Sequence, residues 1–172
     1  TGLTGAYQER QGVSPSPWLA LIRGKGVDVK NSTDALGSFG QGANAPFSMS
    51  QVRSLFYLSR CEHEGKIEDR FIGKTILSSG WEIDEAGQEY LTSATGYFSP
   101  GPEIAPFLDG EIPDWALSSR QGITDEIGTS IFIPAPIELG GPHMLEQSIA
   151  DSVMLNFYFA IEQGFLEIVL PS

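Results

Sequence analysis

The sequence predicts an α/β fold, in which a mixed and mostly antiparallel sheet is accompanied by helices. Two strand-like runs, 54–60 and 70–78, flank a charged turn around Gly65, which is the pattern of an antiparallel hairpin. A third apolar run, 128–134, is typical of a later strand. Apolar residues recur at steps of three and four over 144–161, and this periodicity predicts a helix near the end of the chain.

Chain length and charge limit the class of protein. The 172 residues, of which 41% are hydrophobic, suffice for one ordinary core, so we expect a single domain over 1–172. The formal charge of −12 argues against direct nucleic-acid binding, which needs clustered Lys and Arg. Nine of the ten Lys and Arg lie at or before Lys74, whereas the rest of the chain carries Arg120 against fifteen acidic residues. The acidic second half is expected to be a solvated face.

Cysteine content and hydropathy indicate the compartment. Cys61 is the only cysteine, which excludes an intramolecular disulfide and a zinc site built from cysteines. Neither a signal peptide nor an apolar run of transmembrane length is present, so we expect a cytoplasmic protein without a membrane partner. The chain begins at Thr1 without a methionine, which is typical of a fragment of a longer protein.

The first part of the chain is rich in glycine and proline, and we expect a lid-like region over 1–36. Within it, 18–23 is expected to form a short helix, with Ser16 as the N-cap and Pro17 at the first helical position. The polar segment 24–36 is expected to be a mobile lid.

A glycine-rich loop comes next. Gly37, Gly40 and Gly42 have the spacing G-x-x-G-x-G, and the following run, 45–57, has apolar residues spaced as on one face of a helix. Such a loop offers unpaired backbone amides and the positive end of a helix dipole, which suit a phosphate. Taken alone, the spacing is equally typical of a plain turn.

The remaining elements are expected to be short. Residues 81–96 form a polar connection, 97–98 a short strand, and 115–117 the beginning of a helical turn between prolines. Residues 143–172 are expected to form a terminal helix and strand, with Gly164 at the C-cap and the strand over 165–170.

Other motifs are rejected as sites. Gly73-Lys74-Thr75 is not part of a P-loop, because Glu68 occupies the position of the first glycine, and Lys74 is expected to face solvent from a strand. His63 and His143 belong to no recognisable triad or metal pair. We assign no catalytic residue and no metal ligand.

Three glycine-containing segments follow one another in a distinctive order, namely Thr1-Gly2-Leu3, the glycine loop and Gly128-Thr129. This order resembles the GHKL ATPases, the superfamily of gyrase, the heat-shock chaperones, histidine kinases and MutL. The likeness extends to prokaryotic ATP-binding proteins of that superfamily, some of which belong to phage-defence or DNA-modification gene clusters. It rests on further segments: Phe56-Tyr57-Leu58-Ser59-Arg60, Arg70-Phe71-Ile72-Gly73-Lys74, Thr95-Gly96-Tyr97-Phe98 and Gly128-Thr129-Ser130-Ile131-Phe132-Ile133.

The resemblance implies a Bergerat-type two-layer sandwich with helices on one face, and ATP with Mg²⁺ as the cofactor. Backbone amides of the glycine loop would hold the triphosphate. Thr129 would bind adenine directly or through water, although β-propensity alone also explains a threonine there. Asn44 is expected to cap the helix, with a phosphate contact as the alternative. The implied cofactor-binding residues are Thr1, Gly2, Gly37, Ser38, Phe39, Gly40, Gln41, Gly42, Ala43, Asn44 and Thr129.

Hydrolysis in this superfamily uses a glutamate and a magnesium-binding asparagine spaced E-x-x-x-N on an early helix. No such helix precedes Thr1, and the adenine-binding aspartate would also lie upstream of it. We therefore expect ATP binding here, and hydrolysis coupled to lid closure and to a homodimer or protein partner in the parent protein. Two alternatives stay open: a non-catalytic interaction module with an acidic face, and a phosphotransferase of the histidine-kinase type.

Overall fold

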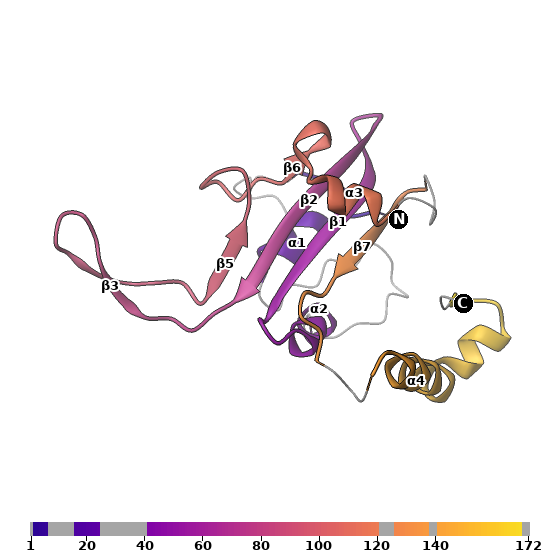
Figure 1. The fold of residues 1–172 in the computed structure, drawn as a ribbon. Helices are drawn as coiled ribbons and strands as arrows, with labels where there is room; N and C mark the ends of the chain where they lie inside the picture. Colours follow the sequence, from indigo (N-terminus) through magenta and orange to yellow (C-terminus); the bar gives the residue numbers. More distant parts are fainter. Residues whose placement is uncertain (1, 7–15, 25–40, 121–125, 138–140, 170–172) are drawn as a thin grey trace. The chain divides into compact units, whose positions relative to one another are not determined.

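The computed structural model describes residues 2–6, 16–24, 41–120, 126–137 and 141–169. These fall into two compact units, Thr1–Pro136 and Ile137–Ser172, and each unit is described by itself. The first unit contains the main sheet and the second contains one long helix (Figure 1). The single domain over 1–172 stays a prediction.

A long antiparallel hairpin forms the centre of the first unit. Strand β1 (Ser54–His63) pairs with β2 (Lys66–Ile76) along its whole length. The two residues of the turn, Glu64 and Gly65, have φ values of 52° and 76°, which a two-residue turn of this type requires. The predicted hairpin is confirmed, but its strands extend well into the stretch expected as a charged turn.

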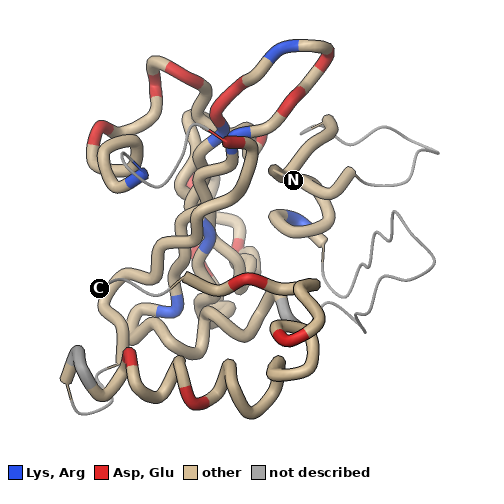
Figure 2. Tube along the Cα trace, turned by 90° about the vertical axis from the view of Figure 1, so that its right-hand side faces the viewer, with Lys and Arg blue, Asp and Glu red and all other residues tan. Residues whose placement is uncertain are grey.

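Opposite charges explain why the strands continue through that polar stretch. The register sets Arg60 of β1 opposite Asp69 of β2, and the two side chains form an ion pair at 3.5 Å. Pairing of opposite charges across two strands stabilises a sheet even where few residues are apolar. Several of the basic residues lie on β1 and β2 together with a few carboxylates, whereas many other carboxylates lie in connecting loops (Figure 2).

Shorter strands complete this sheet. Its order is β5-β2-β1-β7, with β6 also pairing with β2, and the added strands are β5 (Thr95–Phe98), β6 (Phe107–Leu108) and β7 (Gly128–Phe132). Strands β5 and β7 confirm the strands predicted over 97–98 and 128–134. Every pairing among the described strands is antiparallel, so the mixed sheet of our prediction is not seen in this part of the chain.

One face of the sheet, here called the first face, is covered by α1 (Pro17–Ile22). Ser16 caps this helix, because its hydroxyl accepts a hydrogen bond from the Leu19 amide at 3.2 Å, as predicted. The core on this side combines the helix with the β1 residues Leu55 and Tyr57 and with β2. Its buried members are Trp18, Leu19, Ile22, Phe47, Leu55, Tyr57 and Ile72.

The opposite, second face is covered by α3 (Asp114–Ser118), the helical turn predicted at 115–117. Figure 1 shows α1 and α3 on opposite sides of β1 and β2. Aromatic rings dominate this side and contact one another at centroid separations between 5.1 and 6.3 Å. They belong to Phe56, Phe71, Phe98, Phe107, Trp115 and Phe132.

Helices thus cover both faces of the described sheet, where our prediction placed them on one. The physical reason is visible in the continuous apolar run of β1. Leu55 and Tyr57 are buried on the first face and Leu58 on the second, so each face has to be shielded from water.

The helix expected over 45–57 is much shorter. Helix α2 (Gln41–Asn44) leads into the 3₁₀ helix η1 (Ala45–Met49), which ends before β1. Arg53, with φ of 46°, bends the chain between η1 and the strand. Leu55 and Phe56 therefore belong to β1, where they pack into the cores of the first and the second face.

Three further elements lie in this unit. Residues 81–96, expected as a polar connection, contain a separate hairpin of β3 (Trp81–Ile83) and β4 (Glu89–Leu91). A 3₁₀ helix, η2 (Asp109–Glu111), follows β6. No helix in the described part of the chain combines the length and the apolar character needed to cross a lipid bilayer.

The second unit contains α4 (Pro142–Glu162), which confirms the predicted terminal helix. Gly164 has φ of 73° at its end, and the Phe165 amide donates to the Ala160 carbonyl at 2.8 Å, as expected of a glycine C-cap. The strand expected over 165–170 is absent from the described residues 165–169. An apolar run becomes a strand only where another strand offers an edge for pairing.

Candidate functional site

A row of polar side chains crosses three strands on the first face. The register places Arg70 of β2 and Thr129 of β7 on either side of Ser59 in the middle of β1. Paired residues in a sheet direct their side chains to the same face, so these three groups are neighbours. Ser59 and Arg70 have no exposed surface. Buried polar side chains need hydrogen-bond partners, and the partners of this row show which segment of the chain it binds.

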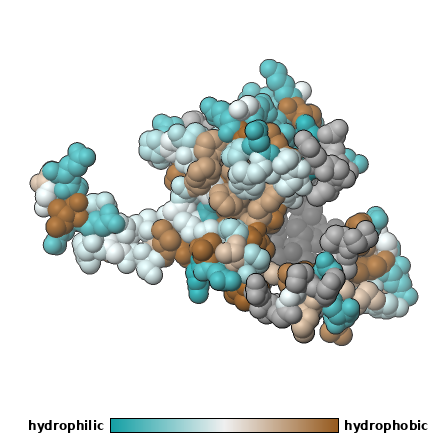
Figure 3. All heavy atoms as spheres, in the orientation of Figure 1, coloured by the Kyte–Doolittle hydropathy of each residue, from teal (hydrophilic) through white to brown (hydrophobic). Residues whose placement is uncertain are grey.

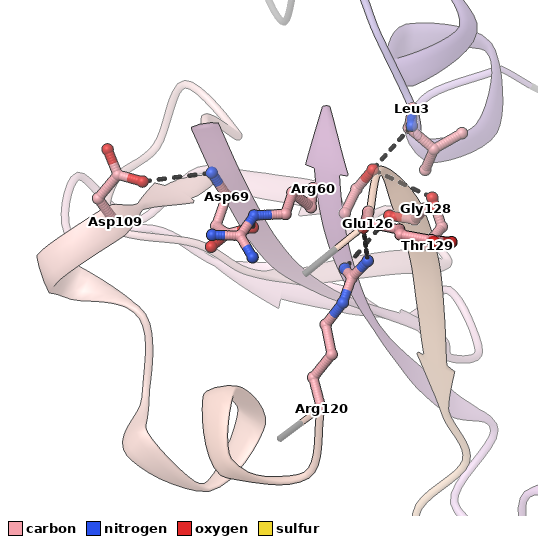
Figure 4. Close-up of polar contacts among 9 residues, drawn as sticks. Leu3, Arg60, Asp69, Asp109, Arg120, Glu126, Gly128 and Thr129 are labelled. Atoms are coloured by element: carbon pink, nitrogen blue, oxygen red, sulfur yellow. Dashed lines mark hydrogen bonds and ion pairs between the residues drawn. The ribbon is translucent and has the colours of Figure 1, made fainter. Parts of the chain in front are cut away.

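Ser59 joins the row to the beginning of the chain. Its hydroxyl lies 3.0 Å from the Thr129 hydroxyl and accepts a hydrogen bond from the Leu3 amide at 2.7 Å (Figure 4). Gly2 lies directly on β1, because a Cβ atom there would come within 2.0 Å of the Arg60 carbonyl oxygen. Only glycine allows so close an approach of two backbones. Two of the predicted binding residues, Gly2 and Thr129, are thus brought to one place.

Arg70 holds the next part of the same segment. Its guanidinium donates to the Gly5 carbonyl at 2.6 Å and forms an ion pair with Glu68 at 2.5 Å. The charged group also lies 5.5 Å from the ring centroid of Trp18 in α1. Segment 2–6 therefore crosses the strands over the polar row, fixed by hydrogen bonds to Ser59 and Arg70.

The hydroxyl of Thr129 has hydrogen-bonding capacity beyond the row. Thr129 is partly exposed, and a hydroxyl has one donor and two acceptor sites. Whichever of Ser59 and Thr129 is the donor in their bond, the threonine oxygen keeps a further site for another group. The arrangement can therefore bind a small polar ligand through Thr129.

Arg120 fixes the start of the strand that carries Thr129. It follows α3 and donates to the carbonyl oxygens of Glu126 at 2.7 Å and Gly128 at 3.3 Å (Figure 4). These bonds tie β7 to the helix on the second face. Arg120 was not among the predicted site residues. Its position as the lone Lys or Arg of the acidic half could have indicated that it has specific partners.

The glycine loop is described only at its end. Five of the predicted binding residues lie outside the described residues, namely Thr1, Gly37, Ser38, Phe39 and Gly40. Residues 25–36 of the predicted mobile lid lie outside them as well. Gln41, Gly42, Ala43 and Asn44 form α2. Asn44 is exposed at the N-cap of η1 but makes no capping hydrogen bond through its side chain, so the predicted capping role is wrong.

Phe47 anchors the chain after this loop to the first face. It is buried in the same core as α1, with Leu3 packed against that core as well. The segment that follows the glycine loop and the segment that carries Gly2 therefore meet the same face of the sheet. The structure thus shows that both segments pack on one face of the sheet, which the sequence did not reveal.

Lys74 differs from our prediction. It is only 8% exposed, its ammonium donates to the Leu21 carbonyl at 3.3 Å, and it lies 6.0 Å from the ring centroid of Phe47. The expected solvent-facing lysine is wrong, because the register places Lys74 on the first face beside Ile72. A lysine can pack its aliphatic stem in a core while its charge reaches a carbonyl at the rim.

Other ionisable groups on this face are held in their neutral form. Burial raises the pKa of Tyr57 to about 12 and also raises the pKa of the Cys61 thiol. A thiol whose pKa is raised in this way is a poor nucleophile near neutral pH. We therefore assign neither side chain a catalytic role.

Sequence reasoning missed Ser59 and Arg70 in addition to Lys74. Each lies two residues along its strand from a buried apolar residue of the first face, Ser59 from Tyr57 and both Arg70 and Lys74 from Ile72. A polar residue at a core position is the signal that could have found them.

Metal-binding clusters and cavities are two further features of the described residues that could indicate a ligand. The described residues contain no group of three or more His, Cys, Asp or Glu able to hold a metal ion. A cavity of about 480 Å³ lies beside the start of β1 and the end of β2. Its lining contains none of the predicted site residues and consists of Gln51, Val52, Arg53, Ile76, Leu77 and Ser78.

Comparisons of the chain with protein-family models, curated proteins and solved structures found no match.

Proposed function

We propose that this chain binds ATP in the manner of the GHKL ATPases. The observation that carries the proposal is the link from Leu3 through Ser59 to Thr129, at 2.7 and 3.0 Å. It joins the first and third of the three glycine-containing segments whose order suggested the family. The chain that leaves the second segment packs on the same face through Phe47.

In this proposal the described residues have distinct roles. The Thr129 hydroxyl binds the adenine, directly or through water. The hydrogen bond between Ser59 and Thr129 orients the threonine hydroxyl. Gly2 keeps the first segment against β1. The amides of the glycine loop, Gly37 to Gly42, and of Ala43 hold the triphosphate. Lys74 is given no role in phosphate binding, because its side chain is buried and its ammonium donates to the Leu21 carbonyl.

The wider properties follow from the same hypothesis. Mg²⁺ accompanies the triphosphate, with its protein ligand and the catalytic base left unassigned within this chain. Closure of the lid region over the nucleotide would bury its phosphates and couple binding to a homodimer or protein partner. A cytoplasmic protein of a phage-defence system is the setting that the resemblance suggests.

Calorimetric titration with Mg²⁺-ATP tests the proposal. We expect binding to the wild-type protein, and binding about tenfold weaker in Thr129→Val, because one hydrogen bond of about 1.4 kcal/mol is lost. Ser130→Ala is the matched control, since Ser130 neighbours Thr129 on the same strand but lies on the other face. The double variant Gly40→Ala/Gly42→Ala should also weaken binding.

The result can contradict the proposal in two ways. Absence of binding to the wild-type protein would exclude the nucleotide site, and equal affinities in Thr129→Val and Ser130→Ala would remove Thr129 from it. Thermal denaturation with and without ATP separates this function from a non-catalytic interaction module, because only a ligand of the native state raises the melting temperature.

A further inference from the structure

The hairpin formed by β3 and β4 has no core of its own. Every residue of both strands is exposed, including Trp81 at 72%, Ile83 at 68% and Leu91 at 57%. An isolated two-stranded hairpin is marginally stable in water, and large apolar side chains gain free energy only when they are covered. The hairpin therefore presents a surface whose apolar side chains are available to another molecule.

Hydrogen bonds at both ends nevertheless give the hairpin a defined backbone. At its tip the Asp84 carboxylate accepts from the amides of Ala86 at 2.9 Å and Gln88 at 2.8 Å, and Gly87 supplies the left-handed φ of 81°. At its base the Thr92 amide donates to the Gly80 carbonyl at 2.8 Å. The exposed side chains thus project from a prearranged frame.

The register separates the side chains into two sides. Trp81 lies opposite Leu91, and Ile83 lies opposite Glu89, so these four residues share one side. The other side carries Glu82 opposite Tyr90, whose hydroxyl donates to the Glu82 carboxylate at 3.1 Å. One side is therefore apolar with a carboxylate at its margin.

Charge distinguishes which molecule this apolar side can meet. Residues 81–91 carry four carboxylates and no Lys, Arg or His, and the chain has no basic residue between Lys74 and Arg120. Figure 3 shows apolar and hydrophilic atoms next to each other at the end where Figure 1 labels β3. The four carboxylates of this small hairpin make the approach of anionic lipid, nucleic acid or a second copy of the same hairpin unfavourable.

We propose that the β3–β4 hairpin is a docking surface for a basic protein segment that alternates apolar and Lys or Arg side chains. Its apolar residues cover Ile83 and Leu91, and one cation lies over the Trp81 ring. The remaining cations pair with Glu89, which lies on the same side, and with Glu85 in the turn. Asp84 is left to form the turn. This surface is independent of the proposed nucleotide site.

Fluorescence anisotropy with a labelled peptide of alternating Lys and Leu tests the proposal, with a Glu and Leu peptide as the charge-reversed probe. We expect the basic peptide alone to bind the full chain. Binding should weaken about tenfold or more in Trp81→Ser/Ile83→Ser/Leu91→Ser, which removes the apolar contacts, and in Glu85→Gln/Glu89→Gln, which removes the charge pairs.

Matched variants elsewhere on the chain decide whether the effect is local. Val52→Ser/Ile67→Ser removes exposed apolar residues, and Glu103→Gln/Glu111→Gln removes two exposed carboxylates. Each should change the affinity less than about twofold, and urea titration verifies that all variants are folded. Equal weakening by the control and hairpin sets would overturn the proposal, as would failure of the basic peptide to bind.

Two other occupants are separated by further measurements. Sedimentation that shows self-association lost in the Trp81 variant would identify a second copy as the occupant and overturn the proposal. Binding to phosphatidylcholine vesicles that depends on Trp81 would likewise identify a lipid surface. We expect neither, because burial of four carboxylates against like charge or lipid is unfavourable.

Discussion

Arg70 is completely buried and has a charged, a polar and an aromatic partner. Its guanidinium contacts the Glu68 carboxylate, the Gly5 carbonyl and the Trp18 ring. A charge taken out of water is tolerated only where such partners replace its hydration. Arg70 therefore connects three parts of the chain, namely β2, α1 and the segment that carries Gly2.

Arg70→Met should lower the free energy of unfolding by about 3 kcal/mol, because it leaves Glu68 and the Gly5 carbonyl without their partner. Arg60→Met is the matched control. Its ion pair with Asp69 is partly exposed, at 29% and 19% for the two side chains, and we expect a loss of at most about 1 kcal/mol. Urea denaturation measures both, and similar losses would show that the burial of Arg70 carries no special weight.

Tyr57 makes stability depend on alkaline pH. Its pKa is raised by burial from 10.0 to about 12 in the folded protein, so the folded state holds this proton more tightly than the unfolded state. The resulting stability is complete below pH 10 and is lost as the pH rises through 12. A shift of this size corresponds to a free energy on the order of 3 kcal/mol.

Denaturation midpoints between pH 9 and 12 check this dependence. The wild-type protein should lose stability more steeply than Tyr57→Phe above pH 10, since phenylalanine has no proton to release. Identical slopes in the two proteins would contradict the assignment. Absorbance of tyrosinate at 295 nm gives a second reading of the same titration.

Strand pairing in the main sheet explains why glycine occupies position 73, which the local sequence pattern does not. Gly73 of β2 lies between Phe56 of β1 and Phe98 of β5, whose rings meet edge to face at 6.0 Å. A Cβ atom at Gly73 would come within 2.8 Å of both phenylalanines. Glycine is needed there to let two aromatic rings close over the strand.

Gly73→Ala should destabilise the protein by about 1 to 3 kcal/mol, because the added methyl group forces the two rings apart. Gly101→Ala serves as the control, since a Cβ atom there meets nothing within 4 Å. Thermal or urea denaturation compares the two variants. A neutral effect of Gly73→Ala would mean that the aromatic cluster of the second face adapts without cost.

Much of this level of organisation could be predicted from the sequence. The β1–β2 hairpin, β5, β7, α1 with its Ser16 cap and α4 with Gly164 all follow from local pattern and turn chemistry. The β3–β4 hairpin was missed because its short strands bury nothing, and the helix over 45–57 was overextended because strand pairing overrides helical spacing.

The two units differ in what holds them together. All buried apolar residues of the described chain lie between Trp18 and Ala116, within the first unit, whereas the second is built on one helix. A single helix gains most of its stability from packing and little from its own propensity. The first unit therefore has the core that independent folding requires.

A chain ending at Pro136 is expected to fold cooperatively and to keep the near-ultraviolet circular dichroism of its aromatic residues. Its urea midpoint should stay close to that of the full chain, since the buried core is unchanged. An unfolded or non-cooperative fragment would contradict this expectation and would assign the terminal helix a structural role. Residues 137–172 alone provide the complementary measurement, in which we expect little helix.

The sequence by itself determined most strands and helices, the hairpin turn at Gly65 and the three glycine-containing segments, because these depend on local periodicity and backbone freedom. The nucleotide hypothesis also came from the sequence. Only the tertiary structure decided that Gly2 and Thr129 meet across Ser59, that Lys74 and Arg70 turn inward and that both faces of the sheet are covered. The physical reason is strand register, which sets the face that each side chain joins and is fixed by contacts between residues far apart in the chain.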